Sequence, residues 1–389
     1  MLILFLIERI VCVVYERLSY LAMMTILFCT PYKFGPDFIL GGIGIWARHM
    51  LVYSQNDNSI SVIPVSLDRQ TANTSLLGRA YSGIKEYSKI VKKISERISY
   101  DKPDVLHLCT SASISLVKDF IILQLARKHH VKTVVHYHFG RIPEIAKKNN
   151  WEWKLLKIVS KKADMSITMD RKSYEVLFPI YGEKITNIPN PLSSSITELI
   201  EELSPVERKK NKIVFVGHVI PSKGVYELVE ACKEIGTVSL SLVGAISDNV
   251  RKEIVKIAGT GSDSWLTMNG EVGMRDVIRE MLSASVFALP SYTEGFPNVI
   301  LESMACGCSI VASDVGAIPE MLNAGSNEEC GICVPPKNVV ALKDALTLML
   351  NHPDYANECS QRAKFRVNDF FSMPIVWEQL KSAWYKAAK

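Results

Sequence analysis

Short runs of β-branched and aliphatic residues alternate with amphipathic helical segments along nearly the whole chain. The first series of runs lies at 26–29, 105–108, 133–136, 165–168 and 185–188, with helical segments at 43–54, 76–99, 112–129 and 151–162 between them. A second series lies at 213–216, 239–243, 265–268, 286–289, 309–312 and 331–334. Strands that alternate with helices predict parallel sheets covered by helices on both faces, which is an α/β fold.

The alternation breaks once, at the two prolines of the segment Asn187-Ile188-Pro189-Asn190-Pro191. The polar residues 193–212 that follow predict a linker between two doubly wound domains. We expect an extension at 1–22, a first domain at 23–206, a second at 207–370, and a helix at 371–389 that packs back on the first. Ligands of such domains bind at the carboxyl ends of the strands, so the cleft between the domains is the expected site.

The amino-acid composition and the net charge exclude several classes of protein. Apolar residues make up 48% and charged residues 22% of the 389, which excludes disordered, fibrous and coiled-coil proteins. Of the net charge of +5, residues 1–206 carry +7 and the remainder −2, so the two halves are expected to meet different partners. This charge is too small to imply a nucleic-acid partner.

The nine cysteines are scattered and odd in number, which favours a reduced, cytosolic compartment. Cys306 and Cys308 are too close for one arm of a zinc site, and the Cys330/Cys333 pair has no matching second pair. The sequence therefore predicts no metal site.

Residues 1–22 are apolar but are interrupted by Glu8, Arg9, Glu16 and Arg17, so the uncharged runs are too short to span a bilayer. No basic residue precedes the first apolar run, which argues against a signal peptide. The stretch is either an amphipathic helix lying on a membrane or a segment before the true start, and we assign it no function.

Two glycine-rich segments could approach an anion. Gly41-Gly42-Ile43-Gly44 follows the first predicted strand and opens a helix, where free N–H groups can meet a phosphate. It lacks the third glycine of the dinucleotide fingerprint, and a flexible turn explains it equally well. The second segment, 214–224, ends in Lys223-Gly224; a lysine beside a helix start could neutralise a diphosphate, although the spacing is not that of a P-loop.

The most specific pattern is Glu294-Gly295-Phe296-Pro297-Asn298-Val299-Ile300-Leu301-Glu302. Pro297 suits the start of a helix, whose free N–H groups then face the preceding loop. The carboxylates of Glu294 and Glu302 lie on either side of that helix start. Because carboxylates repel phosphate, sugar hydroxyls are their expected partners.

With these motifs in place, the chain from about residue 25 to its end resembles the retaining nucleotide-sugar glycosyltransferases of family four, the group one type with the GT-B fold. The E-x7-E motif of Glu294 and Glu302 is the most specific point of resemblance. The glycine loop (Gly41, Gly42, Gly44), the segment ending in Lys223-Gly224, the segment 187–190 and the segment 312–320 support it.

The resemblance implies roles for individual residues. Glu294 holds hydroxyls of the donor sugar, Glu302 binds the ribose, Lys223 contacts the phosphates, and His138 is the active-site histidine, whereas His136 is structural. The glycine loop and the residues Gly295, Phe296, Pro297, Asn298 and Val299 bind the donor, and Gly244, Glu271 and Val272 lie near its base. The family often has arginine where this chain has His218, so the phosphate contacts depend more on Lys223.

The implied reaction moves a hexosyl unit, with retention, from a nucleoside-diphosphate sugar, with UDP favoured, to a glycan or a lipid-linked saccharide in cell-surface polysaccharide synthesis. No metal or other cofactor is required. The rows Lys85/Lys89/Lys92 and Lys154/Lys157/Lys161 are either solvated helix faces or a surface that docks on an anionic membrane, which would make the enzyme peripheral at the inner face of the plasma membrane. The alternatives are a nucleotide-sugar epimerase of similar fold and a non-catalytic sugar-nucleotide-binding protein.

Overall fold

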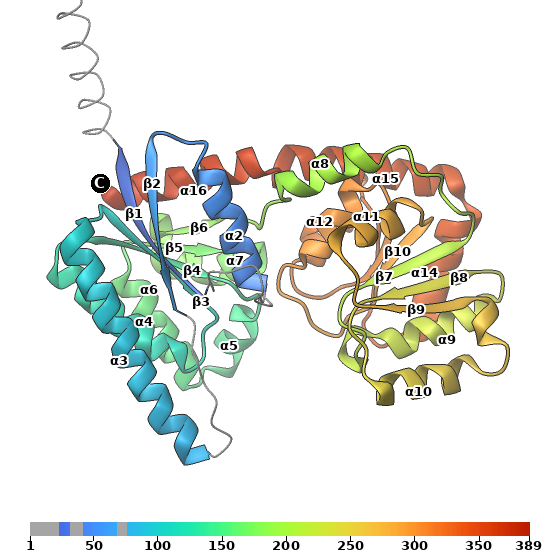
Figure 1. Cartoon of the computed structure of the whole chain (residues 1–389), viewed down its shortest axis with the longest axis horizontal. Helices are drawn as coiled ribbons and strands as arrows, with labels where there is room; N and C mark the ends of the chain where they lie inside the picture. The colour runs from blue at the N-terminus through green and yellow to red at the C-terminus, as the bar shows by residue number, and fades with distance from the viewer. Residues whose placement is uncertain (1–22, 32–41, 68–75) are drawn as a thin grey trace, which may run out of the picture.

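The computed structural model describes residues 23–31, 42–67 and 76–389, and the side chains of all of these except 76–85. The chain folds into two lobes, each built on a six-stranded sheet (Figure 1). Every strand pairing in the two sheets is parallel. The α/β class with two doubly wound sheets on either side of a cleft, predicted from the alternating pattern, is confirmed.

The N-terminal lobe has the strand order β2-β1-β3-β4-β5-β6. Its strands are β1 (Met24–Thr30), β2 (Ile60–Ser66), β3 (Val105–Thr110), β4 (Lys132–Tyr137), β5 (Met165–Thr168) and β6 (Ile185–Asn187). Its helices are α2 (Gly42–Ser54), α3 (Leu76–Asp101), α4 (Ser115–Lys128), α5 (Ile142–Lys148), α6 (Trp151–Lys162) and α7 (Arg171–Tyr181), followed by the 3-10 turn η1 (Gly182–Lys184).

The C-terminal lobe has the order β12-β11-β10-β7-β8-β9. Its strands are β7 (Lys212–Val216), β8 (Ser239–Val243), β9 (Leu266–Gly270), β10 (Val286–Leu289), β11 (Ser309–Ser313) and β12 (Ile332–Val334). Its helices are α8 (Ser194–Leu203), α9 (Val225–Ile235), α10 (Asp248–Ala258), α11 (Met274–Leu282), α12 (Asn298–Ala305), α13 (Ile318–Met321), α14 (Val339–Asn351) and α15 (Pro353–Phe371), with 3-10 turns η2 (Pro221–Lys223) and η3 (Ser262–Ser264). The last helix, α16 (Met373–Ala388), packs on the N-terminal lobe.

Neighbouring residues of the central strands serve opposite faces of the first sheet. Phe28 packs in the cluster formed by α2 and α16, whereas Leu27 packs in the cluster formed by α3 and α4. Because successive side chains of a strand point to opposite faces, a strand buried on both sides is apolar throughout. This explains why these strands appear in the sequence as continuous apolar runs.

Two segments differ from the sequence-based expectation. The strand β2 was not predicted, because Pro64 and two serines interrupt its apolar pattern; β2 lies at the edge of the sheet, where a proline needs no partner for its missing N–H. The predicted linker 193–212 contains helix α8. Its residues Ile196, Leu199, Ile200 and Leu203 recur at helical spacing and pack on the core of the C-terminal lobe.

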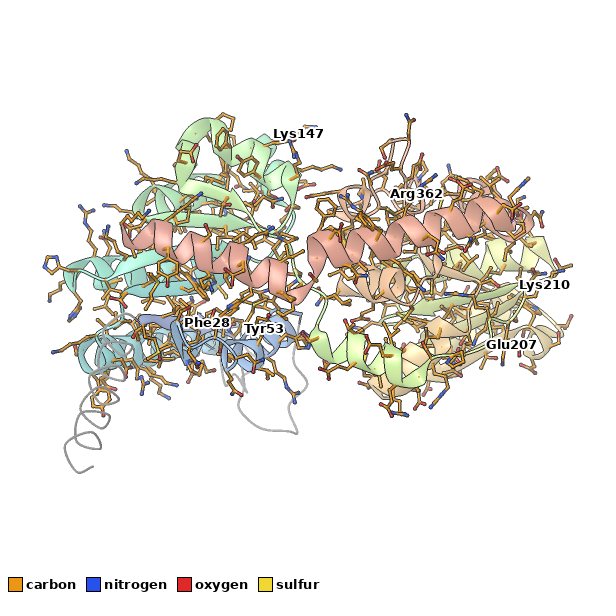
Figure 2. The ribbon with its side chains drawn as sticks, turned by 90° about the horizontal axis from the view of Figure 1, so that it is seen from above. Phe28, Tyr53, Lys147, Glu207, Lys210 and Arg362 are labelled. Carbon is orange, nitrogen blue, oxygen red and sulfur yellow. The ribbon has the colours of Figure 1, made fainter. Side chains whose placement is uncertain are left out.

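The end of the chain crosses back from the second lobe to the first. Figure 2 shows α15 and α16 as one red band running from the lobe that carries Arg362 to the lobe that carries Phe28. The Trp384 indole N–H donates to Nδ1 of His107 at 2.9 Å, and that of Trp377 donates to Asp57 at 2.8 Å. Both tryptophans are fully buried, so α16 is part of the core of the N-terminal lobe.

Candidate functional site

A cavity of about 620 Å³ lies between the two lobes. The C-terminal lobe supplies the loops that follow β7, β8, β9 and β10 and the start of α12. The N-terminal lobe supplies the start of α2, His138 after β4, and Met169 after β5. Both sheets therefore present the carboxyl ends of their strands to one cavity, which is where ligands of doubly wound domains bind. In Figure 1, α2 of the N-terminal lobe faces α12 of the C-terminal lobe across this region.

Lys223 and Glu294 form an ion pair inside the cavity, with Nζ 2.6 Å from Oε1. Lys223 ends η2, and Glu294 lies in the loop after β10; the Tyr292 N–H donates to the Ser222 carbonyl at 2.9 Å and joins the two loops. Gly224 makes this approach possible. Its φ is +70°, and a Cβ there would lie 2.0 Å from the carbonyl oxygen of Pro290. A glycine is therefore required at this position.

The N-terminus of α12 opens into the cavity. Pro297 is the N-cap residue, and no side chain caps the helix. Asn298 and Val299 line the cavity, so free N–H groups of the first turn are available to an anion. Glu302 lies one turn further and also lines the cavity, and burial raises its pKa to about 7. At neutral pH this carboxyl group is therefore poised between accepting and donating hydrogen bonds.

His138 enters from the other lobe and is 9% exposed. Its Nε2 has no hydrogen-bond partner within the described residues, and its ring lies 4.4 Å from that of Trp46 and 4.0 Å from that of His136. Burial lowers the pKa of His138 to about 3, so the imidazole is neutral. His136 does not line the cavity; it is fully buried, and burial holds its pKa well below the ordinary value.

Glycines also shape the far end of the cavity. Gly244, at the end of β8, has φ +138°, and a Cβ on it would lie 1.9 Å from the carbonyl oxygen of Gly217. His218 follows Gly217, and Glu271 and Val272 follow β9; all three line the cavity. Gly244, Glu271 and Val272, which the resemblance places near the base of the donor, thus lie together in the cavity.

Most of the predicted site residues are brought together in this one cavity. Those that line it are Gly42, His138, His218, Lys223, Gly244, Glu271, Val272, Glu294, Gly295, Phe296, Pro297, Asn298, Val299 and Glu302. Gly44 is the exception: it is buried in the first turn of α2 and does not line the cavity. Gly41 lies outside the described residues, as does the extension 1–22.

One polar residue of the cavity, Asn190, was given no site role in the sequence analysis, although it belongs to the segment 187–190 that supported the family resemblance. Its amide donates to Oδ1 of Asn298 at 3.1 Å, while its own Oδ1 is buried without a partner in the described part of the chain. Asn190 also stands between two prolines, at the point where the chain crosses between the lobes.

Two negative findings concern the described residues alone. They contain no cluster of three or more His, Cys, Asp or Glu side chains that could hold a metal ion, and the cysteines among them are all free. No helix in these ranges is both long and apolar enough to cross a bilayer.

Comparison with known proteins shows which family the second lobe resembles. Residues 197–366, which cover most of the second lobe, match the family described as Glycosyl transferases group 1. An uncharacterised 41.2 kDa protein in the cps region of Klebsiella pneumoniae is 24% identical over 301 residues, which are 74% of this chain and 82% of that protein. A putative teichuronic acid biosynthesis glycosyltransferase, TuaC of Bacillus subtilis, is 22% identical over 67% of this chain and 64% of its own length, slightly under two thirds.

Solved structures share the fold at low identity. Sucrose-phosphate synthase of Thermosynechococcus elongatus has a TM-score of 0.71 at 18% identity and is similar over 93% of this chain and 98% of its own. HepE of Anabaena in complex with UDP has a TM-score of 0.64 at 17% identity over 92% of this chain and 99% of its own. Each of these similarities in fold extends over both lobes.

Proposed function

The chain belongs to the glycosyl transferases group 1 family of retaining glycosyltransferases with the GT-B fold, and from this premise we propose that it moves a hexosyl unit from a UDP-sugar to a glycan or lipid-linked saccharide in cell-surface polysaccharide synthesis. One observation carries the proposal. Glu294 and Glu302 flank the uncapped start of α12 in a cavity that also holds Lys223 and His138.

We propose that the donor lies with its diphosphate at the start of α12 and beside Lys223. Negative charge develops on the diphosphate as the glycosidic bond breaks, and fixed N–H dipoles and an ammonium stabilise it there. Glu294 is already paired with Lys223 at 2.6 Å, which holds the lysine in place and leaves the second carboxylate oxygen for sugar hydroxyls. The family resemblance and this geometry support these proposed roles.

We propose that Glu302 takes hydroxyls of the ribose. Its raised pKa suits this role, because a carboxyl group that is half protonated near neutral pH can accept from one hydroxyl and donate to another. UDP as the nucleotide is supported by HepE, which holds UDP in a structure of the same fold.

For the chemical step, the resemblance favours a front-face reaction. The leaving diphosphate then takes the proton of the attacking acceptor hydroxyl, and the new bond forms on the face from which the old one departs. Neutral His138 contributes a hydrogen bond at the sugar rather than a positive charge, because its pKa lies far below neutral pH.

The acceptor, we propose, binds a second cavity of about 420 Å³ in the N-terminal lobe. Ile43 lines both cavities, so the two adjoin. Thr110, Ser111, Ser113 and Ser115 line the second cavity, together with Lys118, whose ammonium is paired with the buried Asp119. The hydroxyl groups of Thr110 and Ser115 donate to Asp119 and to the Ala112 carbonyl, whereas Ser111 and Ser113 are exposed and can offer hydroxyl groups to a saccharide.

A basic surface on the same lobe supports docking on an anionic membrane that holds a lipid-linked acceptor. Lys154, Lys157, Lys161 and Lys184 surround Ile158 and Ile180, which are about half exposed. Each well-placed cation is worth about 1 kcal/mol at an anionic surface. Co-sedimentation with vesicles, with and without anionic lipid, tests this: a Lys154→Glu/Lys161→Glu variant should lose binding, while Lys252→Glu/Lys256→Glu on the other lobe should keep it. Binding that ignores lipid charge removes the membrane role.

The reaction itself is tested with UDP-[14C]glucose and related labelled donors. Label should pass to extracted lipid-linked saccharides, and in their absence slowly to water. Conversion of the nucleotide sugar to its epimer, or binding without turnover, would instead support the epimerase or the binding-protein alternative.

A further inference from the structure

A carboxylate of the C-terminal lobe binds the N-terminal lobe beside the cavity. Glu320, in α13, accepts a hydrogen bond at 2.7 Å from the backbone N–H of Arg171 and another at 3.3 Å from the side-chain amide of Asn187. Arg171 is the first residue of α7, and Asn187 is the last residue of β6. Both belong to the N-terminal lobe, so Glu320 links the lobes directly.

The N–H of Arg171 is available because it lies at a helix start. The first N–H groups of a helix have no partner within the helix. The N-cap side chain of Asp170 accepts from the N–H of Ser173 instead. Glu320 therefore supplies, from the other lobe, the acceptor that this helix start lacks.

A short rigid segment connects Glu320 to Glu294. The Ala317 N–H donates to the carbonyl oxygen of Gly295 at 2.9 Å. Gly316 has φ +56°, and a Cβ there would lie 2.3 Å from the carbonyl oxygen of Glu294, so the two loops are in direct backbone contact. Within α13, the Met321 N–H donates back to Ala317 at 2.9 Å.

The other side of α13 is held as well. The guanidinium of Arg366, on α15, donates to the carbonyl oxygens of Glu320 and Met321, each at 2.9 Å. The backbone of Glu320 cannot shift without disturbing either α15 or the Glu294 loop. A further contact between the lobes, the ion pair of Lys172 and Asp314, is longer at 3.8 Å and exposed.

We propose that Glu320 is a positioning residue for the transfer reaction: by binding the Arg171 N–H across the cleft, it sets the spacing at which His138 of one lobe and Glu294 of the other face the same ligand. The inference rests on the proposed function for its kinetic readout only. Displacement of reacting groups by about 1 Å costs up to about a hundredfold in rate, so loss of this contact should be visible in turnover.

The test removes the backbone N–H of Arg171 that donates to Glu320. Arg171→Pro deletes the N–H that Glu320 binds, at a first helical position that accepts proline. Asp170 is extended (φ −127°, ψ 151°), a conformation compatible with a following proline. Arg171→Ala is the matched control, because it keeps the N–H. Both variants lose the same side chain and its ion pair with Glu175.

We expect Arg171→Pro to lower the turnover of UDP-glucose, measured as UDP release, by about tenfold or more relative to Arg171→Ala. The dissociation constant for UDP, which the C-terminal lobe binds, should change less than twofold. Glu320→Ala should reproduce the loss, and Glu320→Gln, which keeps an acceptor oxygen, should restore most of the rate. If Arg171→Pro does not fold, the turnover of Glu320→Ala and Glu320→Gln tests the proposal instead.

Equal turnover in Arg171→Pro and Arg171→Ala, or in Glu320→Ala and wild type, overturns the proposal. If the wild-type chain turns over no nucleotide sugar, the proposed function fails and the contact is tested by small-angle X-ray scattering alone. A larger radius of gyration in Arg171→Pro than in Arg171→Ala then supports the positioning contact, and equal radii overturn it.

Discussion

The ammonium group of Lys223 lies 2.6 Å from the carboxylate of Glu294, although the two residues are 71 positions apart in the sequence. The pair is partly buried in the cavity between the lobes, at 28% and 11% side-chain exposure. In the reaction we propose, this pairing keeps both groups oriented before the donor binds, which lowers the cost of organising the site at the moment of reaction.

We predict that Glu294→Ala and Lys223→Ala each lower turnover of the nucleotide sugar by at least about a hundredfold, the scale of losing one transition-state contact. Circular dichroism should show an unchanged fold. The control is Lys343→Ala, which breaks an exposed ion pair with Glu234 in the same lobe at 2.8 Å. Rates near wild type in either cavity variant would contradict the role of this pair.

The raised pKa of Glu302 predicts a pH-dependent stability. Its pKa of about 7 lies above the ordinary value of 4.5, so the folded state holds the proton more tightly than the unfolded state. Between these two values the free energy of unfolding therefore falls as the pH rises. A shift of that size corresponds to about 3 kcal/mol for a wholly dry carboxyl group, and partial exposure lowers the expectation to about 1–2 kcal/mol.

Glu302→Gln should accordingly unfold at a higher urea concentration than wild type at pH 8 and at nearly the same concentration at pH 4. Glu328→Gln changes the same functional group on an exposed part of the same lobe and serves as the control. An advantage of Glu302→Gln that is equal at both pH values would show that burial does not hold the proton on this group.

The close contact of Gly224 with the Pro290 carbonyl predicts that a side chain at this position lowers stability by steric overlap. This cost can be measured separately from the cost of the positive φ. Gly224→Ala should be less stable than wild type because of its positive φ, which costs about 1–2 kcal/mol, and because its Cβ would overlap the Pro290 carbonyl. Gly261 has a similar φ of +79° with nothing within 4 Å of its Cβ position, so Gly261→Ala carries the strain alone.

Urea unfolding of the two alanine variants isolates the overlap. We expect Gly224→Ala to be less stable than Gly261→Ala by about 1–3 kcal/mol, the usual cost of overpacking, and to lose turnover because Lys223 moves with the loop. Equal free energies of unfolding for the two variants would contradict the prediction, because they would show that the Pro290 loop moves to accommodate the new Cβ.

The buried contact of Trp384 with His107 predicts that α16 is required for a stable N-terminal lobe. Trp384→Phe keeps most of the apolar volume but leaves Nδ1 of His107 without its donor at 2.9 Å. An unsatisfied buried acceptor costs about 1–3 kcal/mol. Trp151→Phe, on a residue that is 54% exposed, is the control, and a loss no larger than that of the control would contradict the assignment.

A structural feature can be predicted from the sequence when the residues that determine it lie close together in the chain. Strand runs such as 286–289, the helix start at Pro297, and the spacing of Glu294 and Glu302 are local, and they gave the fold class and the main cavity residues. Edge strand β2 was missed because its position, which permits Pro64, is a property of the whole sheet.

Contacts between lobes are beyond local patterns. The meeting of Glu320 with the N–H of Arg171, 149 positions away, depends on how two finished domains face each other. Asn190 enters the cavity for the same reason. In α8, by contrast, a local signal was present, because Ile196, Leu199 and Leu203 recur at helical spacing. The polar composition of the segment led instead to the prediction of a linker.

The central claim is that the cavity between the lobes binds an activated sugar through Glu294, Glu302 and the start of α12. A thermal-shift screen of the full chain with UDP, GDP, ADP and their sugars tests it most directly, because a ligand at 100 times its dissociation constant adds about 2.7 kcal/mol to the free energy of unfolding. We predict a clear rise in Tm with UDP and UDP-sugars that is lost in the Glu294→Ala/Glu302→Ala variant. If no nucleotide or nucleotide sugar raises the Tm of the wild-type chain, or if the double variant responds as wild type does, the claim is contradicted.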